Sequence, residues 1–152
     1  MKIEHVQEIS ASVSDVWGLT VDVESLPDLT STITKVGRLE QGPLGIGSEV
    51  LIKQPGQRER VWTVNEFEPE RRFAWTTKAI GLTMTGCHDL RRSDTGTSNT
   101  LTIELTGTLA PVVGPLIQRS IRKALATENE GFRVFAEDGG LINQAKPDHN
   151  ID

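Results

Sequence analysis

The chain has 152 residues, a length that suits one domain whose core needs neither disulfides nor a structural metal. Its formal net charge of −5 argues against a nucleic-acid-binding domain, because such domains gain affinity from basic surface. The only cysteine, Cys87, excludes an internal disulfide and fits a reducing compartment. Neither a membrane-length apolar run nor a signal-peptide stretch is present, so we expect a cytoplasmic protein without an integral membrane segment. The sequence does not specify an oligomeric state.

The first segment of the chain has the pattern of a strand. Residues 2–10 alternate loosely in polarity, which predicts a strand that carries His5 and Gln7 on its more apolar face. Ser12 and Asp15 then have the spacing of a capping box, with aspartate in place of the usual glutamate. This predicts a short helix directly after the first strand.

A second helical turn is expected over residues 24–29, where Pro27 limits its length. Most of the following chain reads as strands separated by short turns rich in glycine, proline and aspartate, which predicts an antiparallel meander. The facing of the strand around Trp62 and Phe67 is ambiguous and suggests a bulge. The expected strands cover residues 33–40, 49–54, 60–67, 72–78, 82–92 and 98–109.

A long amphipathic helix is predicted over residues 112–138, with regular geometry beginning near Pro115. Glu128 lies roughly 20° from the centre of its apolar stripe, where a carboxylate needs a partner, water or a raised pKa. Gly139 and Gly140 predict the end of the helix. We therefore expect a single domain over residues 1–140, followed by a poorly ordered tail at 141–152.

The order of these elements, with three local motifs, resembles the START-like (SRPBCC) superfamily and especially its polyketide cyclase/dehydrase branch. The motifs are Val16-Trp17 after the first strand, the segment 64–75 across the middle hairpin, and Gly107 to Pro111 before the last helix. The resemblance implies an α+β helix-grip fold, in which a curved seven-stranded antiparallel sheet surrounds the long C-terminal helix. It also implies two short helices after the first strand and an apolar ligand cavity between sheet and helix.

Two side chains on inward faces could carry chemistry. His88 shares the apolar parity of its strand with Met84 and could act as a general base or orient a ligand carbonyl. A core histidine satisfied by a neighbour is the alternative. Glu128 could serve as acid, base or anchor for a ligand hydroxyl, or it could be a carboxylate near the cavity mouth that reaches water or Arg60.

Further residues on inward faces are expected to contact a ligand, although ordinary core packing explains the apolar ones equally well. Histidines and the cysteine lack ligand spacing, so we expect no metal site, and nothing in the sequence indicates a cofactor. No Gly-x-Ser-x-Gly elbow of a serine hydrolase is present. The expected ligand-binding set is His5, Gln7, Asn65, Phe73, Trp75, Met84, His88, Ile117, Ile121, Leu125 and Glu128.

The sequence thus favours a protein that binds a hydrophobic small molecule of lipid, polyketide or aromatic type. The first alternative is a cyclase/dehydrase-like enzyme, in which His88 or Glu128 removes a proton beside a ketone while Asn65 or Arg60 steadies the enolate oxygen. The second alternative is a protein-interaction domain with a vestigial pocket. The residues supply isolated polar candidates but no spacing that demands catalysis.

Overall fold

The computed structural model describes residues 1–145 and has a single antiparallel sheet, whose strand order is β1-β7-β6-β5-β4-β3-β2. Successive strands from β2 to β7 pair as neighbours, as short turns require, and β1 closes the far edge against β7. The α+β helix-grip fold expected from the sequence is confirmed. In chain order the elements are β1 (Lys2–Ile9), α1 (Val13–Val21), the 3₁₀ turn η1 (Val23–Ser25), α2 (Leu26–Leu29), β2 (Lys35–Arg38), β3 (Glu49–Lys53), β4 (Arg60–Glu68), β5 (Arg72–Ala79), β6 (Leu82–Ser93), β7 (Gly96–Thr106) and α3 (Ala110–Ala145).

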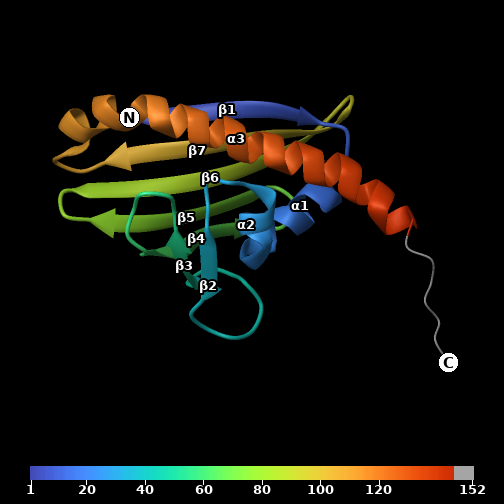
Figure 1. Ribbon diagram of the computed structural model, residues 1–152, viewed down its shortest axis with the longest axis horizontal. Coiled ribbons are helices and arrows are strands. Elements are labelled where there is room, and N and C mark those ends of the chain that lie inside the picture. The colour runs from blue at the N-terminus through green and yellow to red at the C-terminus, as the bar shows by residue number, and fades with distance from the viewer. Residues whose placement is uncertain (146–152) are drawn as a thin grey trace.

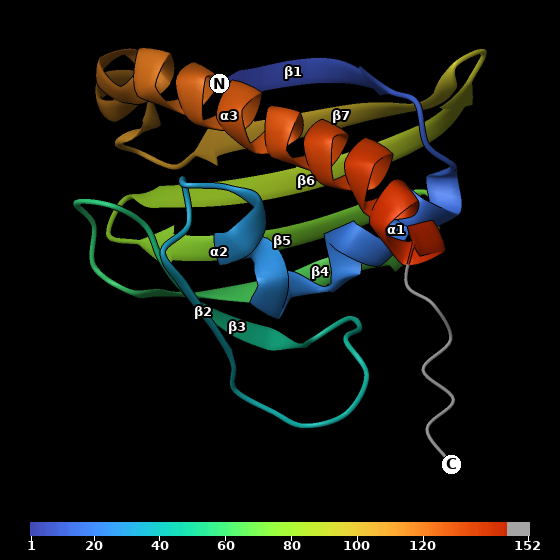
Figure 2. The same cartoon turned by 45° about the vertical axis from the view of Figure 1, so that its right-hand side comes forward.

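The long helix α3 crosses one face of the curved sheet, as Figures 1 and 2 show from two directions. The short helices α1 and α2 lie on the same face, beside the C-terminal half of α3. Ser12 caps α1 as expected, because its Oγ accepts a hydrogen bond of 3.1 Å from the backbone N–H of Asp15. Pro27 lies in the first turn of α2, where a missing N–H costs nothing.

Helix α3 differs from its prediction at both ends. It begins at Ala110 and continues through Pro115, which lies within the helix, so the irregular approach expected before Pro115 is absent. It also continues through Gly139 and Gly140 to Ala145. Glycine lowers helix stability by only about 1 kcal/mol and stops a helix only where the chain turns away. Residues 146–152 of the predicted tail lie outside the described part of the chain.

A β-bulge decides which way the side chains of β4 face. The register between β4 and β5 shifts between Val64 and Glu66, so that Asn65 is the extra residue. Trp62 and Val64 before the bulge are buried, and the bulge lets Phe67 after it pack on the same face. The ambiguity of this strand in the sequence therefore has a structural cause.

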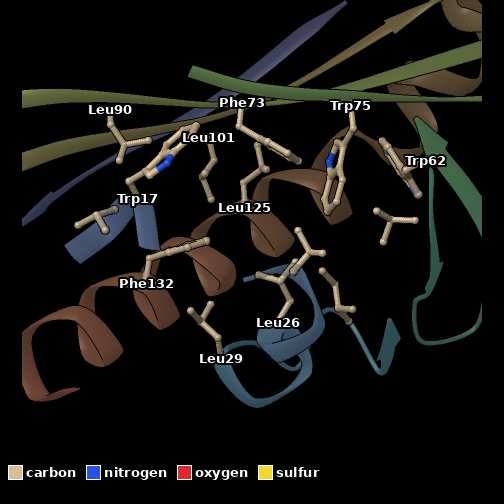
Figure 3. Packing of buried hydrophobic residues seen from close by; sticks show 14 of the residues in the cluster. Trp17, Leu26, Leu29, Trp62, Phe73, Trp75, Leu90, Leu101, Leu125 and Phe132 are labelled. Carbon is tan, nitrogen blue, oxygen red and sulfur yellow. The ribbon is translucent and has the colours of Figure 1, made fainter. Parts of the chain in front are cut away.

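A packed core lies under the C-terminal half of α3, where side chains from sheet and helices interdigitate (Figure 3). Phe73 from β5 and Phe132 from α3 are fully inaccessible to solvent. Trp17 from α1 packs edge-on against Phe67, with ring centroids 5.4 Å apart. Aromatic burial on this scale supplies much of the hydrophobic stabilisation of such a domain. None of the described helices combines the length and hydropathy that a membrane span needs.

Candidate ligand-binding cavity

A cavity of about 500 Å³ lies between the N-terminal half of α3 and the inner face of the sheet. One wall is the apolar stripe of the helix, and the opposite wall comes from β4, β5, β6 and β7. The helix supplies Val113, Ile117, Ile121, Ala124 and Leu125, and the sheet supplies Trp62, Thr77, Leu82, Met84 and Ile103. The remaining polar wall residues are Thr32, Gln54, Gln57, Arg60, Ser120 and Glu128.

A smaller inner cavity of about 50 Å³ adjoins the first and reaches His88 and Trp75. The two cavities share walls at Trp62, Leu125 and Glu128, so Glu128 stands where they meet. The inner cavity could hold a water molecule or a small polar substituent of a ligand. Both cavities have mainly apolar walls, with the polar side chains of His88 and Glu128 in the inner one.

Glu128 is positioned by α3 and has little access to solvent, with 15% of its side chain exposed. Burial penalises the charged carboxylate and raises the pKa of Glu128 to about 7. The partner predicted for it from the sequence, Arg60, lines the same cavity, but no ion pair joins the two in the described residues. A carboxyl group in this state can donate a hydrogen bond to a carbonyl near neutral pH or accept a proton above it.

His88 is positioned by β6 and packs among aromatic rings. Its ring centroid lies 5.8 Å from that of Phe73, 6.4 Å from that of Trp75 and 5.6 Å from that of Phe132. Burial lowers the pKa of His88 to about 4, an effect only partly opposed by the neighbouring carboxylate of Asp89. The imidazole is therefore neutral at pH 7 and offers one donor and one acceptor nitrogen.

The structure brings together His88 and Glu128, the two residues that the sequence predicted to carry chemistry. Nε2 of His88 lies 3.8 Å from Oε1 of Glu128, which is longer than a hydrogen bond. A small movement of either side chain would bring the two atoms within hydrogen-bond distance. Nδ1 of His88 is buried and has no hydrogen-bond partner among the described residues. Buried structural histidines are normally satisfied, so this unpaired nitrogen makes His88 a candidate for a functional role.

Seven residues of the predicted set line a cavity, and their contact with a ligand stays a prediction. Met84, Ile117, Ile121, Leu125 and Glu128 line the larger cavity, while Trp75 and His88 line the inner one. Parity along the strands and helical spacing were sufficient to find these residues.

Four residues of the predicted set line neither cavity, and their contact with a ligand stays a prediction. Phe73 fills the packed end of the core. Asn65 is exposed at the bulge and donates to Oγ1 of Thr76 on the opposite face of the sheet. His5 and Gln7 lie on the edge strand β1, and Nδ1 of His5 is within 3.0 Å of the Asn129 amide.

Sequence reasoning missed a second group of polar residues that line the larger cavity. Thr32, Gln54 and Gln57 come from loops, whose course the local sequence does not fix. Ser120 lies three residues after Ile117, so helical spacing could have found it. In the described chain, no cluster of three or more histidine, cysteine or acidic side chains is placed to hold a metal ion.

A family model described as "Polyketide cyclase / dehydrase and lipid transport" matches residues 1–133, which include every residue of both cavities. The chain belongs to this family. A comparison with curated proteins finds no match.

Solved structures similar to this family member share its fold at low sequence identity. A hypothetical protein from Helicobacter pylori has a TM-score of 0.75 at 14% identity, covering 89% of this chain and 86% of its own. A START superfamily protein from Mycobacterium smegmatis has a TM-score of 0.73 at 14% identity, covering 90% and 97%. The di-domain ARO/CYC StfQ from the steffimycin biosynthetic pathway has a TM-score of 0.71 at 11% identity, covering 91% of this chain and 51% of its own.

Proposed function

We propose that this protein binds a hydrophobic small molecule, of lipid, polyketide or aromatic type, in the cavity between the sheet and α3. The observation that carries this proposal is the cavity itself, with a volume of about 500 Å³ and mainly apolar walls. Ligand pockets for drug-sized molecules occupy roughly 300–1,000 Å³ and have apolar walls with a few polar groups. A vestigial pocket in an interaction domain would be expected to fall below this range.

The polar groups of the cavity suggest how the ligand lies. Its apolar body would contact Met84, Ile117 and Ile121, and an oxygen substituent would reach Glu128 at the junction with the inner cavity. Because burial favours the neutral carboxyl of Glu128, a ketone or hydroxyl is the expected substituent at that end. A ligand carboxylate would be better placed beside Arg60.

Native mass spectrometry of the purified protein, searching for a co-purifying lipid or aromatic molecule, tests the proposal directly. A titration with the fluorescent probe anilinonaphthalene sulfonate tests the location. Ala124→Trp should fill the cavity and abolish probe binding, whereas Thr127→Trp, at an exposed position on the same helix, should leave it unchanged. Equal probe binding by both variants would contradict the proposal.

The second candidate is an enzyme that acts by enolisation, and the separation of 3.8 Å between His88 and Glu128 favours it. Ionised Glu128 would take a proton from the carbon beside a ketone and return it later, with Arg60 near the enolate oxygen. Asn65, the other residue expected to support the enolate, lies on the wrong face of the sheet. Incorporation of deuterium from heavy water into a bound methyl ketone, lost in Glu128→Gln, would support catalysis, and its absence from the wild type would argue against it.

A further inference from the structure

Large apolar side chains are exposed together at one end of the molecule. Ile80 is 96% exposed, Leu116 79%, Val112 65% and Leu109 43%. Ile80 comes from the turn between β5 and β6, Leu109 directly precedes α3, and Val112 and Leu116 come from the start of α3. Exposed apolar groups of this size are normal when scattered, but a contiguous group marks an interaction site.

Backbone contacts hold these residues in one surface. The N–H of Leu109 donates a hydrogen bond of 2.8 Å to the carbonyl oxygen of Gly81, which follows Ile80. Gly81 has a φ of +72° and lies so close to Leu109 that an added Cβ would be 2.7 Å from its Cγ. The turn is therefore fixed against the beginning of the helix, and Figure 1 shows both at the same end of the molecule.

The patch formed by Ile80, Leu109, Val112 and Leu116 borders the ligand cavity without being part of it. Ala79 and Leu82, on either side of the turn, line the cavity, as do the helix residues Val113 and Ile117. Ile80, Val112 and Leu116 each lie directly beside one of these wall residues in the sequence. A surface that covered the patch would therefore sit next to the cavity.

The charge of the helix changes along its length. From residue 110 to 127, α3 carries Arg119, Arg122 and Lys123 and no acidic residue, although the whole chain has a net charge of −5. Arg119 and Lys123 follow Leu116 by three and seven residues, which places them on the same helix face. None of the three basic side chains forms an ion pair within the described residues.

We propose that this docking face, formed by Ile80, Leu109, Val112, Leu116, Arg119 and Lys123, binds the surface of a bilayer that contains anionic phospholipids. Apolar side chains enter the headgroup boundary while neighbouring arginine and lysine contact lipid phosphates, which is the division of labour in interfacial helices. A second copy of the chain fits less well, because a two-fold contact would bring the same basic residues together. The inference goes beyond ligand binding, since it concerns an external surface.

Co-sedimentation with vesicles of phosphatidylcholine, with and without phosphatidylglycerol, measures the interaction. The wild type should bind the vesicles that contain phosphatidylglycerol and bind pure phosphatidylcholine at least about tenfold more weakly, because the anionic lipid supplies the charge attraction. The double variant Ile80→Ser with Leu116→Ser should lose binding by about tenfold or more, since both side chains insert. Ile46→Ser is the matched control, because Ile46 is 73% exposed outside the patch.

The charge contribution is tested with Arg119→Glu and Lys123→Glu together. The matched control is Arg91→Glu with Arg92→Glu, which makes the same change in net charge at an exposed position beside the β6–β7 turn. Loss of binding in the first pair only would support the proposal. Equal loss in both pairs, wild-type binding by the double serine variant, or no binding to anionic vesicles would overturn it.

A measurement without lipid tests whether a second copy of the chain, in place of a bilayer, covers the docking face. Light scattering should show the same mass for the wild type and the double serine variant at all concentrations. A dimer that disappears in the double serine variant would assign the face to a second copy and overturn the bilayer proposal. Probe binding inside the cavity should persist in the double serine variant, so failure of docking is distinguishable from failure of ligand binding.

Discussion

Burial shifts the pKa values of Glu128 and His88 in opposite directions, because it favours the neutral form of each. The pKa of the Glu128 carboxyl rises from 4.5 to about 7. The folded protein therefore holds a proton there that the unfolded chain releases between pH 4.5 and 7, so this group destabilises the fold increasingly across that interval.

Glu128→Gln should remove this penalty. We expect the variant to gain up to roughly 3 kcal/mol of unfolding free energy over the wild type above pH 7 and nothing below pH 4.5. Urea denaturation of both proteins across this pH range measures the difference. A difference that stays constant with pH would show that Glu128 does not titrate in this way.

His88→Leu provides the opposite control. The pKa of His88 falls from 6.5 to about 4, so the unfolded chain takes up a proton as the pH falls through this range and the folded protein resists it. The stability contributed by this group is thus lost at low pH. The free energy of unfolding of the leucine variant should therefore rise relative to that of the wild type only below pH 6.5. Between pH 4.5 and 6.5 the two residues change the free energy of unfolding in opposite directions. In the wild type their combined contribution should therefore be nearly independent of pH in this range.

At the scale of elements, one buried amide joins α3 to the edge of the sheet. Asn129 is fully inaccessible, and its Oδ1 accepts a hydrogen bond of 2.9 Å from Nδ2 of Asn99 on β7. Its own Nδ2 lies within 3.1 Å of the carbonyl oxygens of Asn99 and His5 and within 3.0 Å of Nδ1 of His5. These bonds fix the position and the rotation of the helix beside Glu128.

Asn129→Ala should therefore destabilise the protein by about 2–4 kcal/mol, because it leaves buried partners on both strands without hydrogen bonds. Asn65→Ala, which removes an exposed amide that also bonds across strands, should cost less than about 1 kcal/mol. Chemical denaturation measures both. Similar losses of stability in the two variants would contradict the role of Asn129 in holding α3 to the sheet.

Close approach of α2 to α3 depends on a glycine. A Cβ at Gly131 would lie 2.2 Å from the carbonyl oxygen of Leu29, so the short helix would have to move. Gly131→Ala should destabilise the protein by about 1–3 kcal/mol although alanine favours helix formation. Gly18→Ala in α1, where nothing lies within 4 Å, should stabilise it by about 0.5–1 kcal/mol. Thermal unfolding of the two variants should show opposite shifts in Tm.

The sequence predicted elements and facings well because both depend on local periodicity. Parity on β6 found His88, and helical spacing found Glu128 and its neighbours on α3. Periodicity gives the face of a strand but not the distance along it, so it could not show that Phe73 packs in the core away from both cavities. The bulge at Asn65 breaks the period itself, and no local pattern shows which strand atoms lie opposite Asn129.

At the scale of the whole molecule, one helix face meets two different surroundings. In its C-terminal half α3 presents Phe132 and Ala136 to a filled core, whereas in its N-terminal half Ala124 faces the cavity. The sheet therefore supports dense packing and an open space along one helix. An unfilled space lowers stability, because side chains around it lack contacts that a packed core would provide.

The same substitution at two helix positions should accordingly have opposite effects. Ala124→Leu adds apolar atoms to existing space and should raise the free energy of unfolding by about 1–2 kcal/mol while weakening binding of anilinonaphthalene sulfonate. Ala136→Leu adds the same atoms where the side chain is only 5% exposed in the core, and should lower it by about 1–3 kcal/mol through overpacking. Urea denaturation of the two variants beside the wild type measures both effects. Destabilisation of equal size at both positions would mean that the cavity collapses in solution, and stabilisation without loss of probe binding would place the bound probe elsewhere.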